Sequence, residues 1–144
     1  MIYTAKTKKA LKLCFEAHQD KTDRGGVPYP FHPYHIAEKM KDEDSICVAL
    51  LHDILEETAC TAQQLESYGF DKVVVDAVVA LTKLDGEDYF KYIARVGENE
   101  LAKKVKIADL LHNTDTTRLN GTPTESDFVR CEKYRKAIEM LVLS

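Results

Sequence analysis

The sequence of 144 residues predicts an all-α fold, organised as a single helical bundle. Apolar residues recur at helical spacing along most of the chain, and no clear alternating run indicates a strand. No Asn-Gly or Asp-Gly pair lies between two alternating apolar segments, so hairpin signals are missing too. The length suits one core, and no repeat, linker or low-complexity segment divides the chain. We therefore expect one domain over residues 1–144.

The first three helices can be placed from their boundary residues. The first is expected from about Thr4 to Gln19, followed by the loop "DKTDRGGVPYPFHP", which has two glycines and three prolines. Pro33 suits the first turn of a second helix that continues to Met40. Asp42 or Asp44 can cap a third helix, which carries the stretch "VALLHDILEET".

The second half of the chain continues in the same way. Thr61 and Gln64 form a capping box at the start of a short helix, which Gly69 ends. Asp71 opens a valine-rich segment whose length favours a helix over a strand. Thr124 or Ser126 opens the last helix. The other expected helical segments are "DKVVVDAVVALTKL", "EDYFKYIARV" and "NELAKKVKIADLLHNTDTTRL".

Charge and cysteine usage limit the classes of function. The net charge of −4 argues against a nucleic-acid partner or an anionic membrane surface, but it is compatible with a small anionic ligand. No apolar run is long enough to span a bilayer, and the N-terminal segment has helical spacing instead of a signal-peptide core. The four cysteines form no CxxC pair, which indicates buried thiols and a cytoplasmic protein.

The stretch "VALLHDILEET" carries polar side chains within an apolar segment. In one continuous helix, His52 and Glu56 would share one stripe, and Asp53 and Glu57 would share the next. Burying unpaired carboxylates costs several kcal/mol, and a bound cation would offset this cost. The alternative is a solvated surface with ion pairs within the helix.

Two further polar clusters lie elsewhere in the chain. Asp109 is surrounded by apolar residues in "KVKIADLLHNTD", and Asn113 and Thr116 are expected to continue its face. The alternative for Asp109 is a surface acid paired with Lys106 or Lys103.

The third cluster centres on a histidine before a proline. His32 precedes Pro33, a position that disfavours the α region, so we expect it at a loop–helix junction pointing inward. Together, His32, His52, Asp53 and Asp109 would form a site for a divalent transition metal with positions open to water.

The remaining polar candidates are interpreted as structural. His18 and His112 are expected to pack, and His35 is expected at the surface. Tyr29 could stack on a base or pack the loop. Arg118 could reach an anion, although a solvated cation is the simpler interpretation.

Four segments occur together in a recognisable order: "AHQDKTDRGGVPYPFHP", "ALLHDILEET", "ALTKL" and "VKIADLLHN". Their order and spacing resemble the HD-domain metal phosphohydrolases and, more narrowly, the small stand-alone alarmone hydrolases of the RelA/SpoT type. The resemblance implies an HD-domain helical bundle with bound Mn²⁺, although another divalent transition metal is possible. It implies metal ligands at His32, His52, Asp53 and Asp109.

The resemblance also implies a reaction. The substrate would be a guanosine polyphosphate, (p)ppGpp, or a related nucleotide, and hydrolysis of its 3′-pyrophosphate would give GDP or GTP plus pyrophosphate. Glu56, with Glu57, would position or deprotonate the attacking water. The residues implied to bind substrate are Arg24, Lys83, Asn113 and Thr116.

The chain departs from the family pattern at several positions. It has Asp23-Arg24 where the family often has Arg-Lys, Glu57 where the family has Asp, and Asp115 where an Arg is common. An acid at position 23 is expected to repel a polyphosphate. The alternatives are therefore an HD phosphohydrolase acting on another nucleotide and a non-catalytic nucleotide sensor. The sequence does not indicate an oligomeric state.

Overall fold

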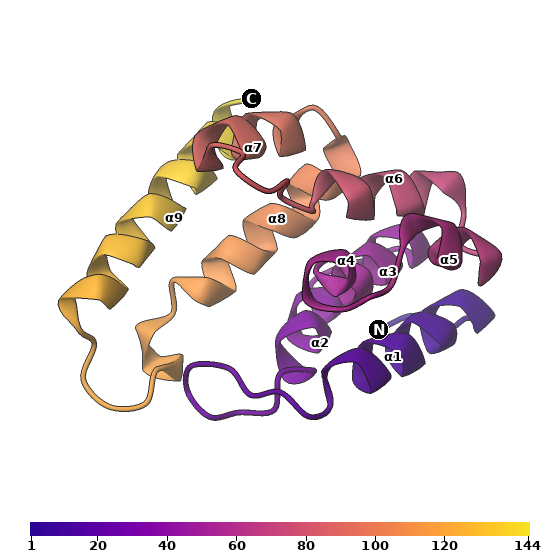
Figure 1. Cartoon of the computed structure of the whole chain (residues 1–144), viewed down its shortest axis with the longest axis horizontal. Coiled ribbons are helices and arrows are strands. Elements are labelled where there is room, and N and C mark those ends of the chain that lie inside the picture. Colours follow the sequence, from indigo (N-terminus) through magenta and orange to yellow (C-terminus); the bar gives the residue numbers. More distant parts are fainter.

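The computed structural model describes residues 1–144. The protein is a bundle of helices with no β-strand, as the sequence predicts (Figure 1). A single isolated bridge joins Thr22 and Pro28 in the first long loop. No helix combines the length and apolar character needed to cross a membrane. The elements are α1 (Ala5–His18), α2 (Phe31–Glu38), α3 (Glu43–Leu51), α4 (Ile54–Glu57), α5 (Ala62–Ser67), α6 (Lys72–Ala80), α7 (Tyr89–Gly97), α8 (Glu100–Asn113), the 3₁₀ helix η1 (Thr116–Arg118) and α9 (Glu125–Leu143).

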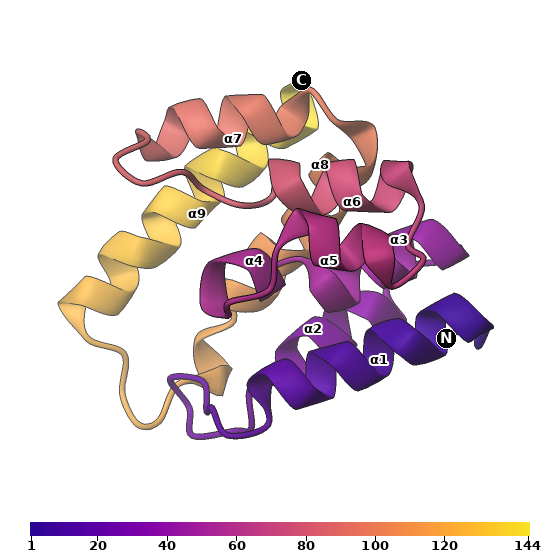
Figure 2. The same ribbon diagram turned by 45° about the vertical axis from the view of Figure 1, so that its right-hand side comes forward.

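Helix α3 is the centre of the bundle. It contacts α1, α2, α6 and α8, and every residue from Ser45 to Leu51 is buried. Helices α7 and α9 pack with α8 on the other side of the bundle. The two long connecting segments, residues 19–30 and 114–124, meet at one end of the bundle (Figures 1 and 2). Because Leu50 is fully buried, truncation to alanine is expected to cost about 2–5 kcal/mol of stability.

Side-chain caps define where most helices begin. Thr4 and Thr61 each form the full capping box with the residue three positions later. Asp42 caps α3, because its carboxylate accepts the N–H of Ser45 at 2.8 Å. Thr124 likewise caps α9. These caps confirm Asp42 over Asp44 and Thr124 over Ser126.

The prediction of one continuous helix through "VALLHDILEET" is wrong. Helix α3 ends at Leu51, and the one-turn helix α4 begins at Ile54. Between them, Asp53 has φ −117° and ψ 10°, outside the helical region. The two expected stripes, His52 with Glu56 and Asp53 with Glu57, therefore do not lie on one helix.

Two other helices end earlier than expected. Helix α6 stops at Ala80, which leaves Lys83 in the following loop. Helix α8 stops at Asn113, and Thr116 lies in η1 instead of continuing the face of Asp109. The carboxylate of Asp115 starts η1 by accepting the N–H of Thr117 at 3.0 Å. A local cap that competes with the helix therefore explains the shorter α8.

Helix α2 begins two residues earlier than the sequence indicated. Phe31 is its first residue, so His32 lies inside the first turn and not before it. Pro33 still occupies the first turn, where its missing N–H breaks no intrahelical hydrogen bond. The side chain of His32 nevertheless points inward and is buried, as expected.

Candidate metal centre

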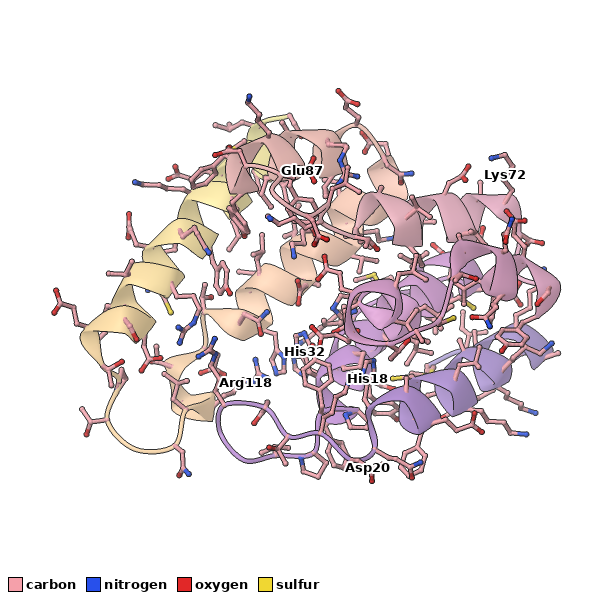
Figure 3. All side chains as sticks on the ribbon, viewed as in Figure 1. His18, Asp20, His32, Lys72, Glu87 and Arg118 are labelled. Atoms are coloured by element: carbon pink, nitrogen blue, oxygen red, sulfur yellow. The ribbon has the colours of Figure 1, made fainter.

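Three side chains from separate elements converge where α2, α8 and the end of α3 meet. The Nε2 atom of His32 lies 2.8 Å from Oδ1 of Asp109. The Nε2 atom of His52 lies 3.5 Å from the same oxygen. Each residue offers one donor atom, and these atoms lie within 4.8 Å of one another. His32 occupies the junction between the two halves of the bundle (Figure 3).

Asp53 lies beside this group of three. Its Oδ2 atom is 3.9 Å from Nε2 of His52 and accepts a hydrogen bond from the Tyr29 hydroxyl. Its Oδ1 atom is buried, makes no hydrogen bond and lies 3.3 Å from Nε2 of His18. Tyr29 therefore packs the loop against Asp53. The four predicted ligands are neighbours, with Asp53 at the edge of the closest group.

The centre attracts positive charge. Burial lowers the pKa of His52, but Asp53 and Asp109 outweigh that effect and raise the pKa to about 9. Burial raises the pKa of Asp109, whereas Lys106, His32 and His52 lower it well below its usual value. The Lys106 ammonium lies 2.9 Å from Oδ2 of Asp109. Asp109 therefore pairs with Lys106, as in the alternative interpretation, but it is buried instead of lying at the surface, and its other oxygen faces the histidines.

The residues present fit a divalent transition metal. Imidazole nitrogens and carboxylate oxygens are suitable ligands for Mn, Fe, Co or Zn. Two carboxylates, Asp53 and Asp109, are buried here, and Lys106 is the one lysine or arginine that pairs with either. The orphaned Oδ1 of Asp53 is a buried acceptor that a cation could satisfy. His32, His52 and Asp109 thus form a possible metal site.

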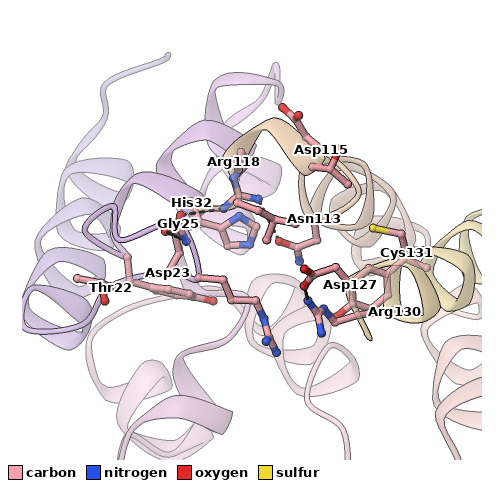
Figure 4. A pocket seen from close by; sticks show the side chains of 15 residues that line it. Thr22, Asp23, Gly25, His32, Asn113, Asp115, Arg118, Asp127, Arg130 and Cys131 are labelled. Carbon is pink, nitrogen blue, oxygen red and sulfur yellow. Dashed lines mark hydrogen bonds and ion pairs between the residues drawn. The ribbon is translucent and has the colours of Figure 1, made fainter. Parts of the chain in front are cut away.

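A cavity of about 330 Å³ lies next to His32 (Figure 4). Its lining includes Arg24, Asn113 and Thr116, three of the predicted substrate-binding residues. The amide of Asn113 donates to Oδ1 of Asp109 at 3.1 Å, which joins the cavity to the candidate metal site. The cavity is therefore suited to place a bound ligand against the metal-binding side chains.

Among the predicted ligands only His32 lines this cavity, and the predicted catalytic and substrate-binding residues that do not line it are Lys83, Glu56 and Glu57. Glu56 and Glu57 are exposed on α4, which directly follows Asp53. The Oε1 atom of Glu56 accepts the backbone N–H of Lys83 at 2.5 Å. These residues therefore form a second group on the α4 side of the candidate metal site.

Asp23 does not present a free acid to the cavity. Its Oδ1 atom accepts the N–H groups of Gly25 and Val27, each at 2.9 Å. Its Oδ2 atom lies 3.2 Å from Nη2 of Arg118 (Figure 4). Burial raises the pKa of Asp23, but these hydrogen bonds and Arg118 lower it overall. Asp23 therefore holds the loop against η1. Because its carboxylate is paired with Arg118, the repulsion of an anion that was expected from an acid at this position is offset.

Helix α9 forms a part of the cavity that was not predicted from the sequence. Asp127, Arg130, Cys131 and Tyr134 line it, and Asp127 pairs with Arg130 (Figure 4). No motif marks these residues, because their role depends on α9 folding back along α8. Their spacing of three to four residues on one helical face is the one signal that could have grouped them.

The chain matches a known protein family. The pattern of the HD domain matches residues 10–110. This range includes the three residues of the possible metal site and extends from within α1 to within α8.

The curated proteins similar to this chain include two bacterial examples. The bifunctional (p)ppGpp synthase/hydrolase SpoT of Escherichia coli K12 is 31% identical over 124 residues, covering 76% of this chain and 18% of that protein. The GTP pyrophosphokinase rsh of Brucella melitensis is 30% identical over 122 residues, covering 75% of this chain and 16% of that protein. The chain thus spans less than a fifth of either relative.

Among solved structures, one example shares the fold along nearly the whole chain. It belongs to a metazoan ortholog of SpoT described as hydrolysing ppGpp and playing a role in starvation responses. The two structures match with a TM-score of 0.75 at 24% identity, covering 99% of this chain and 86% of the other.

Proposed function

Because the chain belongs to the HD-domain family, we propose that it is a metal-dependent phosphohydrolase acting on (p)ppGpp. Hydrolysis of the 3′-pyrophosphate would give GDP or GTP and pyrophosphate. The observation that carries the proposal is the convergence of His32, His52 and Asp109 beside a cavity lined by arginines. The names of the relatives and of the structural neighbour supply the substrate class.

The metal would be held by His32, His52, Asp53 and Asp109, and we propose Mn²⁺, with another divalent transition metal as the alternative. When bound, such an ion supplies Lewis acidity that activates water and polarises a phosphoryl oxygen. Lys106 holds Oδ2 of Asp109, so Oδ1 remains aimed at the two imidazoles. Tyr29 holds Asp53 from the loop by donating to Oδ2, the oxygen nearer to His52, and Oδ1 is left without a hydrogen bond.

The cavity residues would bind and orient the nucleotide. Arg24 makes no ion pair, so its guanidinium is available to a phosphate group. Asn113 and Thr116 would fix the nucleoside relative to Asp109. Lys83 makes one long hydrogen bond of 3.4 Å through its ammonium, which leaves its charge available on the α4 side.

Glu56 is the proposed general acid–base residue, and Glu57 would orient the attacking water. The hydrogen bond from Lys83 N–H fixes Oε1 of Glu56. Oε2 would then take the proton from water and return it to the leaving group. Both carboxylates lie on α4, the one-turn helix whose N-cap residue is the proposed ligand Asp53.

Two alternatives have specific support. Arg118 and Arg130 already pair with Asp23 and Asp127, which leaves fewer free cations for a polyphosphate and favours another nucleotide. A non-catalytic sensor is favoured by the hydrogen bond that occupies one oxygen of Glu56.

Two further expectations concern the whole chain. Buried residues from α1 through α9 form one apolar cluster, which supports residues 1–144 as one domain. All four cysteines are free thiols, which supports a cytoplasmic location.

The test is a product assay with Mn²⁺. Purified protein is incubated with ppGpp, pppGpp and a panel of other guanosine and adenosine nucleotides. Release of pyrophosphate from the alarmones supports the proposal, whereas orthophosphate from another nucleotide supports the first alternative. Binding without any phosphate release supports the sensor. His52→Ala should abolish turnover, and Asp76→Ala on the exposed face of α6 should leave it unchanged.

A further inference from the structure

The two histidines of the candidate metal centre are oriented by different kinds of partner. The Nδ1 atom of His52 lies 2.7 Å from the backbone oxygen of Ala49. The Nδ1 atom of His32 lies 2.7 Å from Nδ1 of His112, with the two rings nearly parallel at 6°. A metal-binding histidine usually donates its second ring N–H to a carboxylate, a carbonyl or water. His32 instead faces a second imidazole.

The hydrogen positions between these rings follow from His32. If Nε2 of His32 gives its lone pair to a cation, the one ring proton must lie on Nδ1. That N–H then donates to Nδ1 of His112, which must carry its own proton on Nε2. A proton on both facing nitrogens would place two donors 2.7 Å apart. Coordination of a cation by Nε2 of His32 would thus fix the tautomers of both His32 and His112.

His112 is held firmly enough to act as this acceptor. Its ring stacks on His35 with a centroid separation of 3.9 Å and an angle of 18°. The backbone oxygen of His112, near the end of α8, accepts a hydrogen bond of 2.8 Å from Nη1 of Arg118. His112 is half-buried, and a surface hollow lined by His32, His35, His112 and Arg118 lies beside its ring. Water can therefore satisfy the Nε2–H of His112.

We propose that His112 is a positioning residue for the metal ligand His32. By accepting Nδ1–H, it selects the tautomer whose Nε2 lone pair points to the metal and fixes the rotation of the ring. The inference rests on the metal site of the proposed function. His112 itself touches neither metal nor substrate, so its effect should be on metal affinity first.

The test compares metal binding by full-length variants. Mn²⁺ titration should show dissociation constants about 10–100-fold higher for His112→Phe, which keeps a ring but lacks an acceptor. His112→Asn places an amide oxygen near the Nδ1 position and should restore binding to nearly the wild-type value. His35→Phe keeps the stack and should leave the affinity unchanged. Unchanged affinity in His112→Phe would overturn the inference while leaving the metal site intact.

A second measurement needs no variant. Nitrogen-15 NMR of the wild-type protein loaded with Zn²⁺ reports the tautomer of each histidine. We expect the proton on Nδ1 in His32 and on Nε2 in His112. A proton on Nε2 of His32 would overturn the inference. Failure of the wild-type protein to bind either Mn²⁺ or Zn²⁺ would overturn both this inference and the proposed function.

Discussion

The Nε2 atom of His32 lies 2.8 Å from Oδ1 of Asp109, although 77 residues separate them in the sequence. The contact joins the first turn of α2 to α8. It brings together two side chains that would each be costly to bury alone.

Replacing Asp109 should weaken both metal binding and stability. Asp109→Asn removes the carboxylate that faces both histidines and leaves the half-buried Lys106 without its acid partner. Breaking a buried pair from one side costs about 3–5 kcal/mol, so urea unfolding should show a clear loss. Asp76→Asn is the control, because its pair with Lys72 is exposed. Equal stability of the two variants would contradict this account of Asp109.

Glu56 should be required for turnover and not for metal binding. Glu56→Gln keeps an oxygen that can accept the N–H of Lys83 but removes the base. We expect kcat to fall about 10²–10⁴-fold with the Mn²⁺ dissociation constant unchanged. Glu57→Gln is the matched variant, with a smaller effect because Glu57 only orients the water. Full activity in Glu56→Gln would remove the assignment.

Gly25 should be needed to close the loop against η1. A Cβ atom at this position would lie 1.8 Å from the backbone oxygen of Arg118. Gly25→Ala must therefore displace the loop, and overpacking of this kind costs about 1–3 kcal/mol. We expect a lower melting temperature and weaker nucleotide binding. Gly97→Ala is the control, because its Cβ would meet its nearest atom at 3.4 Å. Wild-type behaviour of Gly25→Ala would show that this contact is not needed.

The loop that carries Lys83 should lose stability in acid. Arg95 donates to the backbone oxygens of Ala80 and Thr82 and to both oxygens of Glu87. The hydrogen bonds from Arg95 are the main reason that the pKa of Glu87 is lowered from 4.5 to about 2. The stabilisation is present above pH 4.5 and is lost as the pH falls toward 2.

The comparison for that prediction is thermal unfolding as a function of pH. Glu87→Gln should have a lower melting temperature than the wild-type protein at pH 6, and the difference should shrink toward pH 2. Glu139→Gln, at an exposed residue of α9 that forms no ion pair, should show no such trend. A difference that stays constant over this range would contradict the role of Glu87.

Much of the fold could be predicted because helix starts are encoded locally. Thr4, Asp42, Thr61 and Thr124 cap helices through hydrogen bonds to residues three positions away. The break at Asp53 could not be predicted in this way, because no glycine or proline marks it. Contacts from His18 and Tyr29, both far from Asp53 in the sequence, accompany the non-helical backbone there.

The candidate site was predicted in its centre and missed at its edges. His32, His52 and Asp109 were recognisable as polar residues among apolar ones, and the structure brings them together. Arg130 and Tyr134 were missed because their place at the cavity depends on the packing of α9. His112 was expected only to pack, since its distance from His32 is a tertiary feature.

The most direct test of the metal centre is an anomalous-scattering map from crystals grown with Mn²⁺. We predict one strong peak within coordination distance of Nε2 of His32, Nε2 of His52 and Oδ1 of Asp109, with Asp53 alongside. No peak at these atoms when the metal is in excess, or a peak at another site alone, would contradict the central claim.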